Sequence, residues 1–213
     1  MHRHTKEVVS RGNPLETALK AMIFVHGRGA TPESILGLAD ELEVSDFALL
    51  APRASAQTWY PYSFLAPIPQ NEPGLSTGLG VINQIVTDVV TAGISRSNLY
   101  FLGFSQGACL VSEYLARNAQ IYGGAFIYSG GVIGPRVDKS NYGGDFGGTP
   151  ILIGCSDIDA HIPLQRVKES TQMFEELGAT VDEQIYSNGA HTIFMDEIQR
   201  TNRILTKGNP HGS

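Results

Sequence analysis

The chain has 213 residues, of which 42% are hydrophobic and 17% charged, proportions typical of a globular protein with a sizeable core. Its 15 Lys and Arg against 21 Asp and Glu give a net charge of −6, which argues against a nucleic-acid-binding protein. Neither the 24 glycines nor the 11 prolines recur with a period, which excludes collagen-like and solenoid repeats.

The cysteines and the N-terminal residues bear on the cellular compartment. Cys109 and Cys155 are too few for a disulfide framework, and we expect both to be reduced, packed thiols. Residues 1–10 show no signal peptide, and no apolar run approaches the length of a membrane span. We therefore predict a cytoplasmic protein with no membrane insertion and no nucleic-acid partner, and we leave a homodimer open. Residues 207–213 are polar and are predicted to form a flexible tail.

Short apolar runs alternate with longer amphipathic stretches, which is typical of a parallel sheet with helices on both faces. We expect residues 1–206 to form one α/β domain, a mostly parallel doubly wound sheet without a large cap domain. Its active site should lie outside the carboxyl ends of the strands. In chain order we predict an edge strand at 6–10, a strand at 21–25, a helix at 31–42, a strand at 47–51, a helix at 72–92, a strand at 99–104, a helix at 106–118, strands at 124–128 and 150–154, a helix at 163–177, a strand at 180–186 and a helix at 192–205.

The sequence Gly103-Phe104-Ser105-Gln106-Gly107 fits the pattern G-x-S-x-G. In this pattern a sharp turn from strand to helix exposes the serine, and only small residues on either side let the strand and helix approach closely. The alternative is a glycine-rich turn with an ordinary capping serine. A strong predicted strand before the motif and an amphipathic helix after it favour the nucleophile, so we predict that Ser105 is one.

An activated serine needs a base, which on this kind of sheet follows the nucleophile and the acid in chain order. Three histidines follow Ser105, namely His161, His191 and His211. His191 lies in the loop between the last predicted strand and the last helix, where a base could reach back over the sheet edge. His161 is expected at the rim or on the surface, and His211 lies in the tail. We predict that His191 is the base.

The orienting acid has two candidates. Asp157 and Asp159 both follow the predicted strand at 150–154, at the end of the sheet where the site is expected. The spacing does not choose between them. The one that is not used would form a turn or cap a helix, which is the usual role of Asp in such a loop.

Four segments together resemble the phospholipase/carboxylesterase family of α/β-hydrolases, which includes the acyl-protein thioesterases and is related to the dienelactone hydrolases. They are HGRGA at 26–30, GFSQGA at 103–108, SDIDAHIP at 156–163 and GAHT at 189–192. The resemblance extends over residues 21–205 and implies the α/β-hydrolase fold. In this family the acid lies four residues before the proline of a D-x-x-[VI]-P run, which selects Asp159 and leaves Asp157 to organise the loop.

The resemblance also implies that residues 26–29 form the oxyanion loop, with the backbone N–H groups of Arg28 and Gln106 as the two donors. Arg28 stands where the thioesterases usually have an apolar residue. Its guanidinium either favours an acidic group of the substrate or is solvated at the rim, and both hypotheses stay open. The nucleophile is a serine, whereas dienelactone hydrolases use a cysteine.

The segment at 53–75 is too long and too rich in proline for a plain connection, and it carries many aromatic side chains. We predict that it forms an apolar wall of the pocket, with Trp59, Tyr60 and Phe64 in contact with the substrate. The alternative is a loop packed by its own side chains.

These features predict a serine hydrolase that cleaves small carboxylic esters, with thioesters and lysophospholipids as further substrates, through an acyl-enzyme on Ser105 and without a cofactor or metal. A metal-dependent hydrolase using His26, Asp157, His161 and His191 is an alternative, but no H-E-x-x-H or CxxC spacing appears. A non-catalytic ligand-binding homologue and a cofactor-free haloperoxidase or dioxygenase are further alternatives, because a fold does not determine chemistry.

Overall fold

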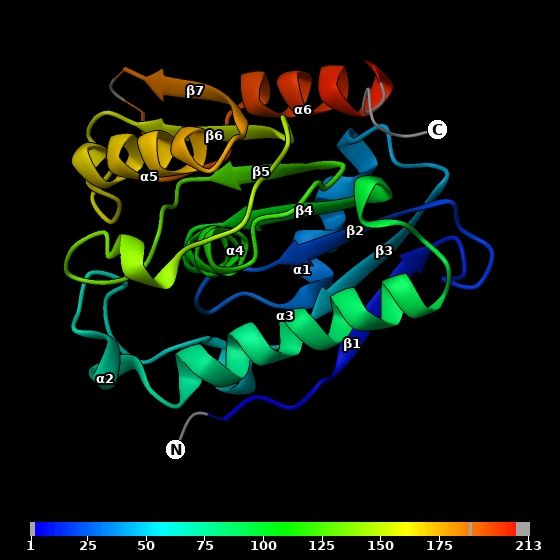
Figure 1. Cartoon of the computed structure of the whole chain (residues 1–213), viewed down its shortest axis with the longest axis horizontal. Coiled ribbons are helices and arrows are strands. Elements are labelled where there is room, and N and C mark those ends of the chain that lie inside the picture. The colour runs from blue at the N-terminus through cyan, green and yellow to red at the C-terminus, as the bar shows by residue number, and fades with distance from the viewer. Residues whose placement is uncertain (1–2, 188, 208–213) are drawn as a thin grey trace.

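A seven-stranded sheet forms the centre of the computed structural model, which describes residues 3–187 and 189–207 (Figure 1). The strand order is β1-β3-β2-β4-β5-β6-β7. β1 pairs antiparallel with β3, and all the other neighbouring strands are parallel. The strands are β1 (Val8–Gly12), β2 (Lys20–Val25), β3 (Phe47–Pro52), β4 (Leu99–Phe104), β5 (Gly124–Tyr128), β6 (Pro150–Ser156) and β7 (Thr180–Tyr186).

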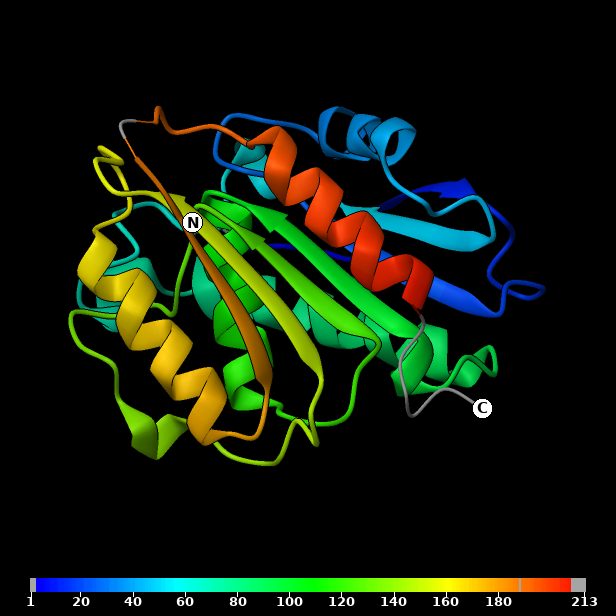
Figure 2. The ribbon, with the colours of Figure 1, turned by 90° about the horizontal axis from the view of Figure 1, so that it is seen from above.

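Helices cover both faces of this sheet (Figure 2). The longer helices are α3 (Gly74–Thr91), α4 (Gln106–Arg117), α5 (Leu164–Glu176) and α6 (Met195–Lys207). There are also two short helices among the described residues, α1 (Pro32–Leu36) and α2 (Ile68–Asn71). Four 3₁₀ turns lie at Gly37–Glu41, Ser55–Gln57, Arg96–Asn98 and Lys139–Asn141. The predicted α/β-hydrolase fold, a mostly parallel sheet with helices on both faces, is confirmed.

Successive side chains of each central strand enter two different cores, because they point to opposite faces of the sheet. Ile23 and Phe101 belong to the core beneath α3, α4 and α5. Met22 and Leu102, one residue away in each strand, belong to the core beneath α1 and α6. Since both faces are buried, the central strands are apolar throughout, which is the pattern that predicted them.

The structure differs from the sequence-based prediction at a few element ends. The helix predicted at 31–42 stops at Leu36 and continues as a 3₁₀ turn. Its start is defined by a capping box, in which the Ser34 N–H donates to Thr31 Oγ1 over 3.3 Å and the Thr31 N–H donates to Ser34 Oγ over 3.1 Å. Lys207, placed in the predicted tail, is the last residue of α6, and residues 208–213 lie outside the described residues.

Further expectations concern the thiols and membrane insertion. Cys109 and Cys155 are both free and buried, as predicted. Within the described ranges, no helix combines the length and apolar character that crossing a bilayer requires.

The parallel strands bring the loops that carry the motifs to one edge of the sheet, on the left in Figure 1, where β5, β6 and β7 end. Ser105 follows β4, and the loops after β2, β6 and β7 contain the other three motifs. The central position of β4, between β2 and β5, places Ser105 in the middle of that edge.

The approach of α4 to β2 generates a prediction about Gly107. A Cβ at this position would collide with the carbonyl oxygen of Val25 and lie 2.6 Å from that of His26. We expect Gly107→Ala to lower the free energy of unfolding by about 2 kcal/mol or more, because a backbone contact this close cannot relax by a rotamer change. Urea unfolding monitored by circular dichroism measures the effect.

Gly80→Ala is the matched control. Gly80 lies inside α3, and a Cβ there would meet nothing within 4 Å. This variant should raise the free energy of unfolding by up to about 1 kcal/mol, because alanine is the better helix former. Equal effects of the two substitutions would contradict the close approach of α4 to β2.

Candidate active site

Ser105 occupies the turn between β4 and α4 in a conformation that L-residues rarely adopt. Its backbone angles are φ 56° and ψ −121°, in the region that favours glycine. Two hydrogen bonds hold this turn: the Ser105 N–H donates to Tyr128 O over 3.0 Å, and the Cys109 N–H donates to Ser105 O over 3.0 Å. A Cβ on Gly103 would lie 2.7 Å from Ala108 Cα, so the glycines of the motif are required by this close approach.

A chain of two hydrogen bonds joins Ser105, His191 and Asp159. His191 Nε2 lies 2.7 Å from Ser105 Oγ, and His191 Nδ1 lies 2.7 Å from Asp159 Oδ2. The Asp159 side chain is fully buried, whereas that of His191 is 18% exposed. The structure therefore brings together, from three separate loops, the three residues that the sequence predicted as nucleophile, base and acid.

The environment of Asp159 favours the carboxylate. Burial opposes its ionisation, but hydrogen bonds from His191 and from the N–H groups of His161 and Ile162 outweigh burial and hold the pKa of Asp159 below its ordinary value. An ionised Asp159 accepts the Nδ1–H of His191, which leaves Nε2 free to accept the Ser105 hydroxyl proton. We assign this tautomer from the hydrogen bonds.

Asp157, the other candidate acid, makes different contacts. Its backbone N–H donates to Tyr186 O over 3.0 Å, which ties the loop after β6 to the end of β7. His161 lies at the rim, as expected, with its ring 4.8 Å from that of His191 in an edge-on arrangement. Phe104 contacts the same imidazole at 5.0 Å between ring centroids.

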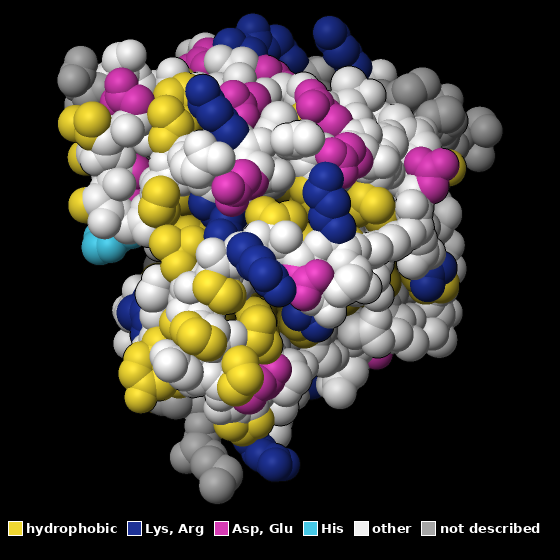
Figure 3. All heavy atoms as spheres, turned by 60° about the vertical axis from the view of Figure 1, so that its left-hand side comes forward, with side chains coloured by type: hydrophobic (Ala, Val, Ile, Leu, Met, Phe, Trp, Pro, Cys, Tyr) yellow, Lys and Arg dark blue, Asp and Glu magenta, His cyan; other side chains and the backbone are white. Residues whose placement is uncertain are grey.

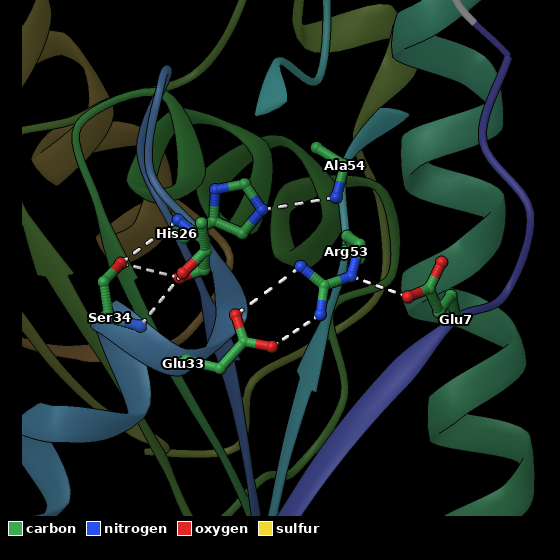
Figure 4. Close-up of polar contacts among 7 residues, drawn as sticks. Glu7, His26, Glu33, Ser34, Arg53 and Ala54 are labelled. Carbon is green, nitrogen blue, oxygen red and sulfur yellow. Dashed lines mark hydrogen bonds and ion pairs between the residues drawn. The ribbon is translucent and has the colours of Figure 1, made fainter. Parts of the chain in front are cut away.

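The predicted oxyanion loop at 26–29 is hydrogen-bonded to the segment after β3. His26 Nδ1 donates to Gly27 O over 2.8 Å. As Figure 4 shows, His26 Nε2 accepts the Ala54 N–H, over 3.2 Å. Burial of the ring lowers the pKa of His26, so the imidazole is neutral. The Gly29 N–H donates to Gln57 O over 2.7 Å. In the described residues, neither the Arg28 nor the Gln106 N–H has an acceptor.

Arg53 adds ion pairs beside this loop, also drawn in Figure 4. Its guanidinium contacts Glu7 at 2.6 Å and Glu33 at 2.5 Å, which connects the segment before β1 and the start of α1 to the end of β3. Both carboxylates are exposed and the Arg53 side chain is half-buried, so each pair contributes little stability by itself.

The Gln106 side chain holds the segment at 58–60, a role that the sequence analysis missed. Gln106 Oε1 accepts the Trp59 N–H over 2.9 Å and the Thr58 hydroxyl over 3.2 Å, and Gln106 Nε2 donates to Tyr60 O over 2.8 Å. The acceptors and donors are mostly backbone atoms far away in sequence. No residue pattern could therefore have indicated this contact.

The Arg28 guanidinium holds the same loop a few residues further on. Nη2 donates to Tyr60 O and to Tyr62 O, each over 2.8 Å, and Nη1 donates to Pro61 O over 3.1 Å. The guanidinium is thus at the rim, but it is bound to the protein rather than simply solvated.

A cavity of about 550 Å³ lies beside Ser105 and His191. Of the three residues predicted to contact the substrate, Tyr60 and Phe64 line this cavity and Trp59 does not. The other lining residues are Gly27, Arg28, Ala30, Pro61, Tyr62, Ser63, Phe104, Gln106, Cys109, His161 and Ile162. Figure 3 views the molecule from the side on which β5–β7 end, and shows an indentation with hydrophobic and histidine side chains at its border.

Trp59 is instead fully buried behind the pocket wall. Its ring lies 5.2 Å from the ring of His4 and 5.2 Å from that of His26, and its Nε1–H donates to His26 O over 2.9 Å. These contacts of the Trp59 ring are made with residues outside the segment at 53–75, so Trp59 neither enters the pocket nor packs on the side chains of its own segment.

Of the four residues of the metal hypothesis, His161 and His191 lie next to each other. Within residues 3–187 and 189–207, no group of three or more His, Cys, Asp and Glu side chains is placed to hold a metal ion.

Glu197 is a buried carboxyl beneath the loop that carries His191. Its Oε2 accepts the Phe194 N–H over 2.7 Å at the start of α6. Its Oε1 lies against Gly154 and has no hydrogen-bond partner among the described residues. Burial raises the pKa of Glu197 to about 8.

Comparisons with known structures agree with this fold. The crystal structure of a phospholipase/carboxylesterase from Dyadobacter fermentans has a TM-score of 0.95 and 42% identity, and the match covers 96% of this chain and 99% of that one. A carboxylesterase from Bacillus cereus, with 18% identity and a TM-score of 0.74 over 94% of this chain and 93% of that one, shares the fold.

Two yeast proteins called acyl-protein thioesterase 1 are similar in sequence. The one from Kluyveromyces lactis is 29% identical over 137 residues, which is 63% of this chain but only 60% of that protein's length. The one from Saccharomyces cerevisiae is 24% identical over 214 residues, or 91% of this chain and 94% of that protein.

The doubly wound sheet and the strained serine turn after its central strand define an α/β hydrolase. A profile of phospholipase/carboxylesterase proteins matches residues 4–209. The chain therefore belongs to the phospholipase/carboxylesterase family, which comprises hydrolases acting on esters, and the resemblance inferred from the four segments is confirmed.

Glu197 leads to a prediction about stability and pH. The folded-state pKa of about 8 lies above the ordinary value of 4.5, so the folded protein binds the proton more tightly. This contribution to stability is complete below pH 4.5 and is lost as the pH rises through about 8. Glu197→Gln cannot titrate and keeps an acceptor for the Phe194 N–H. The free energy of unfolding of the variant, relative to the wild type, should rise by up to about 1.4 kcal/mol per pH unit across this window.

Denaturant unfolding at several pH values measures the difference. Glu175→Gln, which removes an exposed carboxyl from α5, is the control and should leave the pH dependence of the wild type unchanged. A constant offset between Glu197→Gln and the wild type at every pH would contradict a protonated Glu197.

Proposed function

We propose that this protein is a serine hydrolase that cleaves carboxylic esters through an acyl-enzyme on Ser105. The observation that carries the proposal is the unbroken chain of 2.7 Å contacts from Ser105 Oγ through His191 to Asp159. A nucleophile, a base and an orienting acid in this arrangement are what acyl transfer requires.

In the proposed first step, His191 Nε2 removes the Ser105 hydroxyl proton while Oγ bonds to the ester carbonyl carbon. Asp159 remains a carboxylate and stabilises the imidazolium. The N–H groups of Arg28 and Gln106 hold the oxyanion, for which their lack of other acceptors among the described residues suits them. The C–O bond to the alcohol then breaks, and the alcohol leaves with the proton from His191.

In the second half of the reaction, His191 takes a proton from water as the water oxygen bonds to the acyl carbon. The Ser105–acyl bond breaks, Oγ regains the proton, and the carboxylic acid is released. Tyr60 and Phe64 supply an apolar wall for the part of the substrate that does not react. Thioesters and lysophospholipids are further substrates in this proposal, and a cytoplasmic location and a homodimer stay predictions.

An active-site probe tests the nucleophile. A fluorophosphonate should label the wild-type protein on Ser105 and should not label Ser105→Ala. That variant should also lose p-nitrophenyl butyrate hydrolysis by about 10⁴-fold or more, because no covalent intermediate can form. Circular dichroism must show that both proteins are folded. A folded wild-type protein that is neither labelled nor active would overturn the proposal in favour of a non-catalytic homologue.

The two aspartates give an internal comparison of the acid. Asp159→Asn should lower kcat by about 10³- to 10⁴-fold, because an amide cannot stabilise the imidazolium and favours the wrong tautomer. Asp157→Asn, in the same loop, should change kcat by no more than a few-fold. Steady-state kinetics with p-nitrophenyl butyrate measures both, and the reverse order would assign the acid to Asp157.

A further inference from the structure

We propose that the pocket takes esters that carry a second, anionic group, a carboxylate, and that the Arg28 guanidinium binds it. This inference rests on the proposed function and names the substrate class of the same site. It concerns the Arg28 side chain, which is distinct from the backbone N–H assigned to the oxyanion.

The guanidinium is held on the wall of the pocket. Arg28 lines the cavity together with Ser105 and His191, and the three residues whose carbonyls bind the guanidinium line the same cavity. Hydrogen bonds to three backbone carbonyls, at 60, 61 and 62, restrict its rotamers before any ligand arrives. Ordering a side chain costs conformational entropy, and a ligand that binds a side chain already ordered does not have to offset this cost.

The hydrogen bonds leave part of the guanidinium available. Arginine has five N–H groups. Two on Nη2 and one on Nη1 are engaged with the loop carbonyls. The Nε–H and the second Nη1–H have no acceptor within the described part of the chain, so a substrate oxygen can accept from them.

The charge of Arg28 is not neutralised by the protein. In residues 3–187 and 189–207 no carboxylate lies within ion-pair distance of Arg28, whereas Arg53 and Arg200 each contact two. Among the described residues that line the cavity, Arg28 is the one Lys, Arg, Asp or Glu. Carbonyl dipoles orient the guanidinium but carry no net charge. A fixed cation at the rim of a concave, partly apolar pocket attracts anionic ligands.

A purely structural role for Arg28, as a tie between the oxyanion loop and residues 60–62, makes a different prediction. Loss of that tie would alter the pocket for every ester alike. Recognition of an anion would instead affect the anionic member of a matched pair of esters more than the neutral member.

The experiment therefore compares matched pairs. In the first pair, the carboxylate is on the acyl side: mono-p-nitrophenyl adipate against its methyl-capped diester. In the second, it is on the alcohol side: p-carboxyphenyl butyrate against its methyl ester. For each pair the preference is the ratio of kcat/KM for the anionic ester to kcat/KM for the neutral one, with release of the phenol as the readout. The two esters of a pair differ in intrinsic reactivity, but this difference is the same for every variant and cancels when preferences are compared between variants.

In at least one pair, we expect Arg28→Gln to lower the preference of the wild type by about 10-fold or more, as loss of a charge-assisted hydrogen bond does. Arg28→Lys should retain part of it, because the charge remains. Added salt should reduce the wild-type preference. Arg96→Gln removes one positive charge from the turn before β4, at the opposite edge of the sheet, and should leave the preference unchanged.

An equal loss on both members of both pairs would overturn the inference and leave the proposed function standing. If the wild-type protein hydrolyses none of the esters and is not labelled by the fluorophosphonate, the proposed function is overturned, and the inference is overturned with it. If the Arg28 variants do not fold, the inference is tested on the wild type instead, by inhibition of p-nitrophenyl butyrate hydrolysis. Adipamate, with one carboxylate, should inhibit at a concentration about 10-fold or more below adipamide, which has none. Equal inhibition would overturn the inference.

Discussion

The left-handed backbone of Ser105 is the constraint on which the surrounding structure depends. A residue at φ 56° and ψ −121° costs free energy, and it persists only where its neighbours hold it. The neighbours are strand β4 in the middle of the sheet and helix α4, which passes so close to β2 that Gly107 has no room for a side chain. The sharpness of the turn exposes the hydroxyl at the sheet edge, and the parallel order of β4, β6 and β7 brings Asp159 and His191 to it.

A second constraint acts on residues 54–62, which run across the same edge mostly as irregular backbone. Such a segment cannot satisfy its peptide groups through a sheet or helix, so side chains from elsewhere must do so. The Gln106 side chain accepts the N–H of residue 59 and donates to the carbonyl of residue 60. The Arg28 guanidinium donates to the carbonyls of residues 60–62, and the His26 ring accepts the N–H of residue 54. Two of these side chains belong to the residues whose N–H groups are proposed to bind the oxyanion. The pocket wall and the oxyanion donors are therefore positioned by the same residues.

Much of the fold was predictable because both faces of the sheet are covered, so the central strands appear as uninterrupted apolar runs. The turn at Ser105 was predictable for a similar reason: its glycines are demanded by backbone contacts. Spacing left Asp157 and Asp159 open, because both follow β6, and the hydrogen bond to His191 separates them. That residues 1–206 form a single folding unit stays a prediction.

Loop side chains were harder to place. An irregular segment has no period that separates inward from outward positions, so Trp59 was expected in the pocket although it packs behind it. The contacts of Arg28 were not predictable at all, because its acceptors are backbone carbonyls that any residue could supply.

The position of Trp59 gives the tryptophan fluorescence of the protein a single, known origin. It is the one tryptophan of the chain, its indole is in contact with the imidazoles of His4 and His26, and its backbone N–H is bound by Gln106. The indole emission of the whole protein thus originates behind the wall of the candidate active site. A ligand that moves this wall changes the surroundings of that one chromophore, and intrinsic fluorescence then reports on the pocket without any label.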